Sequence, residues 1–159
     1  MTETGISNPI VVAVVSPGED ERALREILDN SAWRLHIATT FAGACLKLRT
    51  CCVVISESSY PDGLGWRDLL LVIQGMISPP PLIVTDRLAD ERLWAEVLNL
   101  GAFDLLAKPF HPREVLHAIT VACSRRQHQE RLIAARSELQ PTGRKVAPAL
   151  KARAAGASR

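Results

Sequence analysis

Five apolar stretches along the chain have the lengths and patterns of β-strands. Ile10 to Val15 is apolar at every position, which is typical of a central strand that is covered on both faces of a sheet. Trp33 to Ala38 instead alternates apolar residues with Arg34 and His36, and this pattern predicts an edge strand with one wetter side. The remaining predicted strands are the apolar run from Cys51 that ends at Glu57, Leu82 to Thr85, and Phe103 to Ala107.

Segments with apolar residues at helical spacing separate these strands. Ser16-Pro17-Gly18-Glu19 has the spacing of a capping box, so we expect Ser16 to cap a helix with Pro17 at its first position. Thr40 can cap a second helix. The inward faces predicted for these two helices are Ala23, Leu24, Ile27 and Leu28 in the first, and Phe41, Ala44, Cys45 and Leu48 in the second.

Three further helices follow the same pattern. One begins near Trp66, and another covers Ala89 to Leu100 and ends at Gly101, a frequent helix stop. Pro112 begins the last helix, which we expect to overhang the core as far as about Leu139. The predicted inward residues are Trp66, Leu69, Leu70 and Ile73; Leu93, Val97 and Leu100; and Val115, Leu116, Ile119, Ala122 and Cys123.

Five strands that alternate with five helices favour a parallel sheet with right-handed crossovers and helices on both faces. The predicted fold class is therefore α/β, a doubly wound three-layer sandwich. A chain of 159 residues, of which 47% are hydrophobic, can bury one such core and hardly a second. We expect an N-terminal extension over residues 1–9, one domain over 10–124, and a basic helix extension with a disordered tail over 125–159.

Charge is divided unevenly along the chain. Residues before Arg125 carry 10 Lys/Arg and 15 Asp/Glu, a net charge of −5, whereas residues 125–159 carry 9 and 2, a net charge of +7. This basic tail lacks aromatic residues and any helix-turn-helix pattern, so a solvated linker is favoured over nucleic-acid binding. No apolar run approaches the roughly 20 residues of a membrane span, and we expect a cytoplasmic protein without a membrane partner.

Cysteine, histidine and serine residues give no sign of a metal centre or of a nucleophilic enzyme. The cysteines have no CxxC or Cys/His ligand spacing, which favours buried thiols. The histidines are scattered and are expected at the surface, and Ser56 and Ser58 lack a neighbouring His/Asp motif. The residues concerned are Cys45, Cys51, Cys52 and Cys123, and His36, His111, His117 and His128.

Polar side chains stand where three of the predicted strands end. Glu57 follows a buried strand and precedes a Pro/Gly loop, Thr85 ends the next strand, and Lys108 follows the last strand, before Pro109. Ligand chemistry in open parallel sheets collects beyond the carboxyl ends of the strands. An acid at that point is therefore a candidate for a functional site.

Two features carry a family resemblance: the order of these strand ends, and the segment Gly101-Ala102-Phe103-Asp104-Leu105-Leu106-Ala107-Lys108-Pro109-Phe110. With these features the chain resembles the receiver domain of two-component response regulators over about Ile10 to Cys123. The resemblance implies a flavodoxin-like sheet of order 2-1-3-4-5, a cis Lys108–Pro109 peptide bond and a role in phosphorelay signalling. In that family an aspartate after the third strand accepts a phosphoryl group from a histidine kinase, two acids after the first strand hold Mg²⁺, and a hydroxyl and a lysine contact the phosphoryl group. The matching positions are Glu57 for the acceptor, Ser16 and Pro17 for the metal-binding acids, Thr85 for the hydroxyl and Lys108 for the lysine.

Several of these positions depart from the family pattern. Glu57 sets its carboxylate one methylene further out than an aspartate, and Ser16 and Pro17 supply no carboxylate for Mg²⁺. Leu105 occupies the position of the family's aromatic switch, and Asp86 adds a negative charge at the mouth of the site. Because phosphoryl transfer depends on positioning and on neutralisation of charge, we expect weak or absent Mg²⁺ binding and no enzymatic activity.

The sequence therefore predicts a pseudo-receiver in which Glu57 reaches toward Lys108 and Thr85 and partly mimics the charge of a phosphoryl group. The plainer interpretation is a structural Glu57–Lys108 ion pair. A further alternative is a Mg²⁺-dependent phospho-accepting response regulator, with the ion recruited by Glu57, Asp62 or Asp86.

The expected partners are proteins: a histidine kinase, an output protein or a second copy of the chain. The resemblance assigns output to the face formed by the helix that ends at Leu100, the strand that ends at Ala107 and the last helix, where the candidates are Arg92, Trp94, Glu96, Phe103 and Arg113. Leu132, Ile133 and Leu139 have no core to join, so a homodimer through the extended last helix is a further expectation.

Overall fold

The structure is a computed structural model, and it describes residues 8–140. The predictions of an N-terminal extension and of a disordered C-terminal tail fall almost wholly on residues outside this range. Within residues 8–140, no helix combines the length and the apolar character that crossing a membrane requires.

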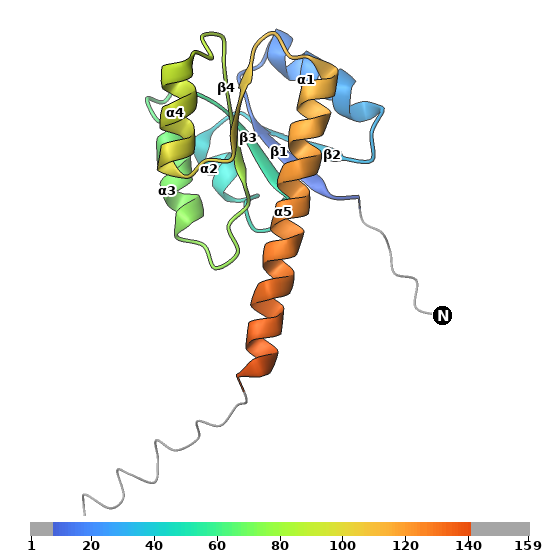
Figure 1. The fold of residues 1–159 in the computed structure, drawn as a ribbon. Helices are drawn as coiled ribbons and strands as arrows, with labels where there is room; N and C mark the ends of the chain where they lie inside the picture. Colours follow the sequence, from blue (N-terminus) through green and yellow to red (C-terminus); the bar gives the residue numbers. More distant parts are fainter. Residues whose placement is uncertain (1–7, 141–159) are drawn as a thin grey trace, which may run out of the picture. The chain divides into compact units, whose positions relative to one another are not determined.

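One parallel sheet of five strands has the order β2-β1-β3-β4-β5 (Figure 1). This order and the predicted α/β fold class are confirmed. The wetter strand predicted from Trp33 to Ala38 lies at an edge of the sheet, and the apolar strand that begins at Ile10 lies inside it. The strands are β1 (Ile10–Val14), β2 (Arg34–Ala38), β3 (Val53–Glu57), β4 (Leu82–Asp86) and β5 (Asp104–Ala107).

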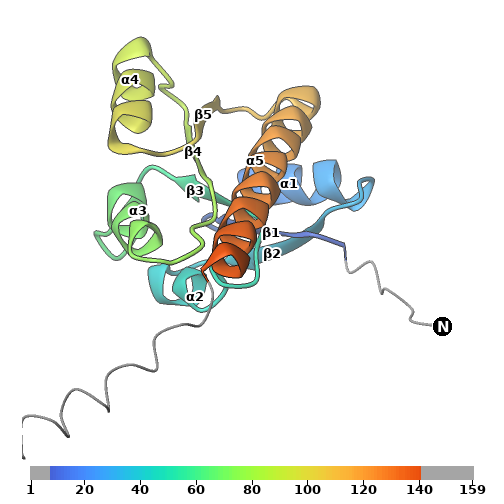
Figure 2. The same ribbon diagram turned by 60° about the horizontal axis from the view of Figure 1, so that its bottom comes forward.

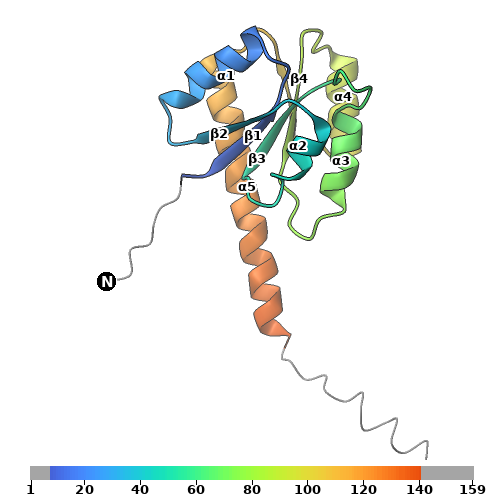
Figure 3. The same cartoon turned by 180° about the vertical axis from the view of Figure 1, so that it is seen from behind.

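Helices cover both faces of the sheet, with α1 and α5 on one face and α2, α3 and α4 on the other, as Figures 2 and 3 show. Alternate residues of β1 supply the two cores: Val11 and Ala13 pack under α1 and α5, whereas Val12 and Val14 pack under the other three helices. The helices are α1 (Glu19–Asp29), α2 (Phe41–Cys45), α3 (Trp66–Gln74), α4 (Glu91–Leu100) and α5 (Pro112–Leu139).

The prediction of a Ser16 cap for the first helix is wrong. Helix α1 begins at Glu19, after Gly18, and no side chain caps its first turn. Pro17 is therefore outside the helix rather than at its first position. By contrast, Thr40 caps α2 as predicted, because its hydroxyl accepts a hydrogen bond from the Gly43 amide at 3.1 Å.

Helix α4 is shorter and less buried than predicted. Its cap is Asp90, which accepts a hydrogen bond from the Leu93 amide at 2.8 Å, so the helix starts at Glu91 instead of Ala89. Val97 is buried, but Leu100 is 45% exposed, and its predicted place in the core is wrong. The physical reason is position, because α4 packs against β5, which is the edge strand of the sheet.

Helix α5 ends at Leu139, where the sequence predicts the end of the helical extension. Four of its predicted inward residues are buried, and Leu116 is half-buried. Arg126 is also buried, and its Nη2 atom donates to the Ser78 carbonyl oxygen at 3.4 Å. The chain divides into two units between Gln127 and His128, and every residue from His128 to Leu139 is exposed.

The thiols follow the sequence expectation in part. Cys51 and Cys123 are buried, Cys45 and Cys52 are half-buried, and all four are unpaired. Burial raises the pKa of Cys51 to about 11 and also raises that of Cys123 well above its ordinary value. Because a thiolate is the reactive form, these two buried cysteines are poor nucleophiles.

Candidate functional site

The register of the sheet brings the predicted site residues to one edge. Glu57 at the end of β3 is paired with Thr85 on β4, and Asp86 is paired with Ala107, which directly precedes Lys108. The carboxyl ends of β1, β3, β4 and β5 therefore meet around Glu57.

The Glu57 carboxylate accepts hydrogen bonds at both oxygens. Its Oε1 atom accepts from Lys108 Nζ at 3.2 Å, and its Oε2 atom accepts from the Ser16 amide at 3.2 Å and from the Ser16 hydroxyl at 3.0 Å. The Ser16 hydroxyl is therefore a donor to the site and not a helix cap. The additional methylene of glutamate lets the carboxylate reach the end of β1.

Lys108 contacts a second acid that the sequence interpretation missed. Its Nζ atom lies 2.8 Å from Asp20 Oδ2, and the lysine side chain is only 8% exposed. Arg87 Nη2 lies 3.9 Å from the same Asp20 oxygen. The available signal was the acidic run from Glu19 to Glu21, which follows β1 and forms the first turn of α1 at the same sheet edge.

Thr85 is in the predicted place, but its hydroxyl has a different partner. The residue is fully buried, and Oγ1 donates to the Ser56 carbonyl oxygen at 3.4 Å. This hydroxyl is therefore not hydrogen-bonded to Glu57 in the described structure, although the two residues are paired across β3 and β4. The Ser56 hydroxyl in turn forms a close hydrogen bond with the hydroxyl of Tyr60, whose pKa burial raises to about 12.

A cavity of about 380 Å³ opens above this network. Three acids and two bases line it, so its charged groups are nearly balanced. Asp86 lines it, and the Oδ1 atom of Asp86 accepts from the Leu88 amide at 2.7 Å. The lining residues are Asp20, Glu57, Ser58, Ser59, Thr85, Asp86, Arg87, Leu88 and Lys108.

The donor set of this cavity does not fit Mg²⁺, the metal that the receiver resemblance implies. The Asp20 and Glu57 carboxylates both accept from the ammonium group of Lys108, so a cationic group already lies between them. Ser16 presents a donor toward Glu57, and Asp62 is exposed and does not line the cavity. Over residues 8–140, no three His, Cys, Asp or Glu side chains are grouped so as to hold a metal ion.

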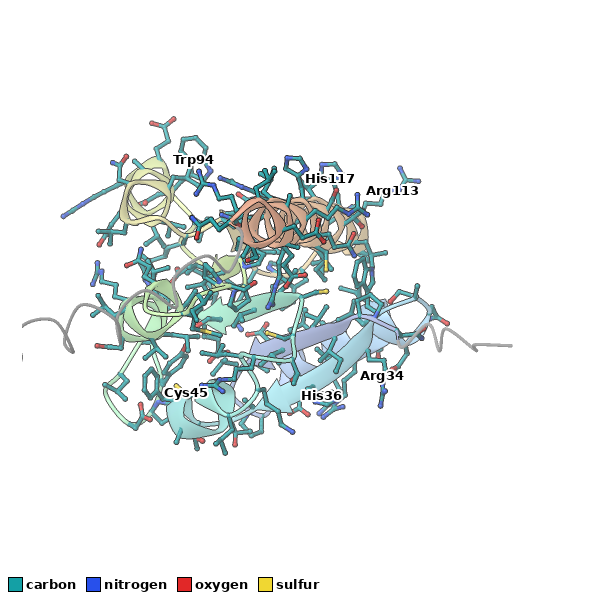
Figure 4. The ribbon with its side chains drawn as sticks, turned by 90° about the horizontal axis from the view of Figure 1, so that it is seen from below. Arg34, His36, Cys45, Trp94, Arg113 and His117 are labelled. Carbon is teal, nitrogen blue, oxygen red and sulfur yellow. The ribbon has the colours of Figure 1, made fainter. Side chains whose placement is uncertain are left out.

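Leu105 lies apart from this network. It is half-buried on β5 and lines a separate groove of about 290 Å³ between α4, β5 and α5. Trp94 lines the same groove and is 50% exposed. Figure 4 shows Trp94 projecting outward from α4, and Arg113 and His117 projecting from α5.

The other predicted interface residues point in different directions. Glu96 forms an ion pair with Arg67 of α3, and Phe103 is half-buried with the Arg125 guanidinium 5.7 Å from its ring centre. Arg92 and Arg113 are exposed but do not line the groove. Trp94 is thus the predicted interface residue that contributes to a concave surface.

Comparisons with known proteins identify the fold. No protein-family model matches the chain, and no curated protein matches it. A Francisella response regulator receiver domain is 21% identical with a TM-score of 0.63, over 74% of this chain and 98% of that one. A CheY-like receiver domain from Methanospirillum hungatei is 19% identical with a TM-score of 0.66, over 77% and 99%.

A third similar structure is the receiver domain of a sensor histidine kinase from Pseudomonas aeruginosa, which has a magnesium ion in its active-site cleft. It is 16% identical with a TM-score of 0.64, over 74% of this chain and 99% of that one. At these identities the comparisons establish the fold, and this fold is that of the CheY-like response regulator receiver domains.

Proposed function

We propose that the chain is a receiver-like module of two-component signal transduction that acts by protein–protein interaction and is not switched by phosphorylation. Its signalling state is fixed by the Glu57–Lys108 pair instead of by a phosphoryl group. We expect the module to act in the cytoplasm, together with a histidine kinase, an output protein or a second copy of the chain.

The observation that carries this proposal is the pair of hydrogen bonds from Lys108 to Glu57 and Asp20, at 3.2 and 2.8 Å. In phosphoryl transfer, cations neutralise the charge that develops on the transferred group. Here the lysine is largely buried and is already shared between two carboxylates. Lys108 balances one of the two carboxylate charges and is hydrogen-bonded to both groups, and Ser16 and Pro17 supply no acid to recruit a divalent ion.

The geometry of Glu57 supports the same conclusion. An attacking carboxylate must present an oxygen in line with the phosphorus atom, and small displacements are costly. Both oxygens of Glu57 are held by donors, from Lys108 on one side and from Ser16 on the other. A phospho-acceptor would have to lose at least one of these contacts before it could react.

The test is phosphorylation by acetyl phosphate with Mg²⁺, monitored by intact mass. We expect no gain of a phosphoryl group by the wild type and measurable gain by the triple variant Ser16→Asp, Pro17→Asp, Glu57→Asp. An NMR titration with Mg²⁺, followed by beryllofluoride, should likewise shift signals near the cavity in the variant alone. The matched control is Glu26→Asp, an exposed position on α1, which should behave as the wild type.

A Mg²⁺-dependent phospho-accepting regulator is the second candidate, because Asp20, Glu57 and Asp86 line one cavity. Rapid phosphorylation of the wild type on Glu57, Ser56 or Ser58, or saturable Mg²⁺ binding, would favour that candidate and contradict our proposal. Nucleic-acid binding by the basic tail stays an alternative prediction; a steep salt dependence in filter binding, lost on removal of residues 125–159, would support it.

A further inference from the structure

Two thiols from distant parts of the sequence meet in the core beneath α1 and α5. Cys52 directly precedes β3, and Cys123 lies on α5. Both pack in the same hydrophobic core, and their thiol groups are hydrogen-bonded to each other. The fold therefore holds two sulfur atoms in direct contact, which is the arrangement that a disulfide bond requires.

Cys51 is next to Cys52 in sequence but belongs to the opposite core. Successive residues of an extended chain point to opposite sides, and Cys51 packs in the core under α2, α3 and α4. Its Sγ atom donates to the Leu48 carbonyl oxygen at 3.4 Å. The hydrogen-bonded partner of Cys123 is thus Cys52 and not Cys51.

The two thiols of the pair differ in their surroundings. Cys123 is 2% exposed, whereas Cys52 is half-buried, so a small oxidant reaches Cys52 first. Burial raises the pKa of Cys123 and its hydrogen bond with Cys52 raises it further, while the positive charge of Arg126 acts in the opposite direction. Arg126 is buried one helical turn beyond Cys123, and a cation there favours the thiolate form when Cys123 reacts.

We propose that Cys52 and Cys123 are a redox-responsive pair that forms a reversible disulfide bond when the protein meets hydrogen peroxide. The Cys52 thiolate attacks one peroxide oxygen, the O–O bond breaks, and hydroxide leaves as Cys52 becomes a sulfenic acid. The Cys123 sulfur then attacks the Cys52 sulfur, and the S–S bond forms as the sulfenic oxygen departs with the Cys123 proton as water. The two sulfurs together lose two electrons, and the peroxide is reduced to water.

This modification goes beyond the proposed function and does not use Glu57 or Lys108. In a reducing cytoplasm the pair would remain as thiols, and disulfides that form there are usually transient and redox-sensing. The bond would join the start of β3 to α5 and so fix the position of that helix on the sheet.

The test is treatment of the folded full chain with hydrogen peroxide, without Mg²⁺ or a phosphodonor. We expect the intact mass to fall by about 2 Da, because two thiol hydrogens are lost, and dithiothreitol to restore it. After the remaining thiols are blocked, tryptic digestion without reduction should give the peptide 50–67 linked to the peptide 114–125. These peptides contain Cys52 and Cys123, respectively.

Matched variants assign the link, because the peptide 50–67 also contains Cys51. In Cys51→Ala the link should persist, whereas in Cys52→Ala its yield should fall by about tenfold or more. The control is Cys45→Ala, which removes the other half-buried thiol and should leave the yield unchanged. Circular dichroism checks that each variant is folded.

Three results would overturn the proposal. The first is a wild type that only gains oxygen, as sulfinic or sulfonic acid, and forms no link. The second is a link that survives Cys52→Ala or that joins Cys51 to Cys52. The third is the same pairing of thiols in denaturant as in the folded chain, since the pairing would then owe nothing to the contact that the fold creates.

Discussion

Lys108 joins the polar groups at the carboxyl edge of the sheet. Its ammonium group contacts one acid from β3 and one from α1, and it is nearly excluded from solvent. A buried charge that loses its partner is costly, because the remaining group is desolvated without compensation. Removal of the lysine should therefore lower the free energy of unfolding, whereas removal of an exposed ion pair should change it little.

We predict that Lys108→Met lowers the free energy of unfolding by about 2 kcal/mol, because Asp20 and Glu57 would then face one another without a cation. The control is Arg25→Met, which removes a solvent-screened pair with Glu21 and should change stability by less than about 0.5 kcal/mol. Denaturant unfolding measures both values. Equal effects of the two substitutions would show that the Lys108 network has no special energetic role.

For individual residues, the sequence predicts positions in the fold better than it predicts hydrogen-bond partners. Strand ends located Glu57, Thr85 and Lys108 at one edge, because the carboxyl ends of parallel strands converge there. The roles of Ser16 and Asp20 could not be predicted in the same way. They depend on how far the Glu57 and Lys108 side chains reach across the sheet, and that reach is a tertiary property which sequence spacing does not contain.

Individual elements follow local sequence rules wherever a backbone requirement is strict. Gly101 ends α4 in the left-handed region with φ of 105°, as a glycine stop should. Gly75, the residue that ends α3, instead has the ordinary helical φ of −78°. Two glycines at equivalent helix ends thus differ in whether another residue could replace them.

We predict that Gly101→Ala destabilises the protein by about 1 kcal/mol, because alanine is strained at positive φ. The added Cβ would also lie 3.0 Å from Gln74 Nε2. Gly75→Ala should be neutral or slightly stabilising, since its new Cβ meets only ordinary contacts at 3.5 Å or more. Thermal unfolding of the two variants checks the difference, and a similar loss at both positions would contradict it.

The sequence predicts whether each element is a strand or a helix better than it predicts the residues at which the element begins and ends. The strands and helices occur in the predicted order, because apolar periodicity separates the two types of element. Apolar periodicity does not mark Asp90 as the cap of α4, so the predicted helix starts too early. Periodicity also gives the apolar face of a helix but not how far along the helix that face is buried, so Leu100 is predicted in the core although it is exposed.

For the whole molecule, pattern and resemblance contributed different information. Alternation of strands and helices predicted a parallel three-layer fold, whereas the strand order came from the family resemblance, since periodicity does not specify which strands are neighbours. The unit from His128 onward offers exposed apolar side chains, and two of them, Leu132 and Leu139, are seven residues apart and so lie on one helix face.

We predict that the chain self-associates through this helical segment and that Leu132→Asp with Leu139→Asp shifts the assembly toward monomer. Sedimentation at several concentrations measures the change, which should be about tenfold or more in the dissociation constant, because charges would replace apolar side chains that the predicted assembly buries. The control is Leu46→Asp, a substitution at an 84% exposed leucine of the domain. A wild-type chain that is monomeric at high concentration would contradict the prediction.

The lysine between Asp20 and Glu57 has one further consequence. Because the Lys108 ammonium group is part of the chain, it cannot be lost by dilution, chelation or exchange with other ions. The two carboxylates therefore keep a cationic partner whatever metal ions are in solution. The carboxylates at this edge should therefore have the same hydrogen-bond partner in a chelator as in a magnesium buffer.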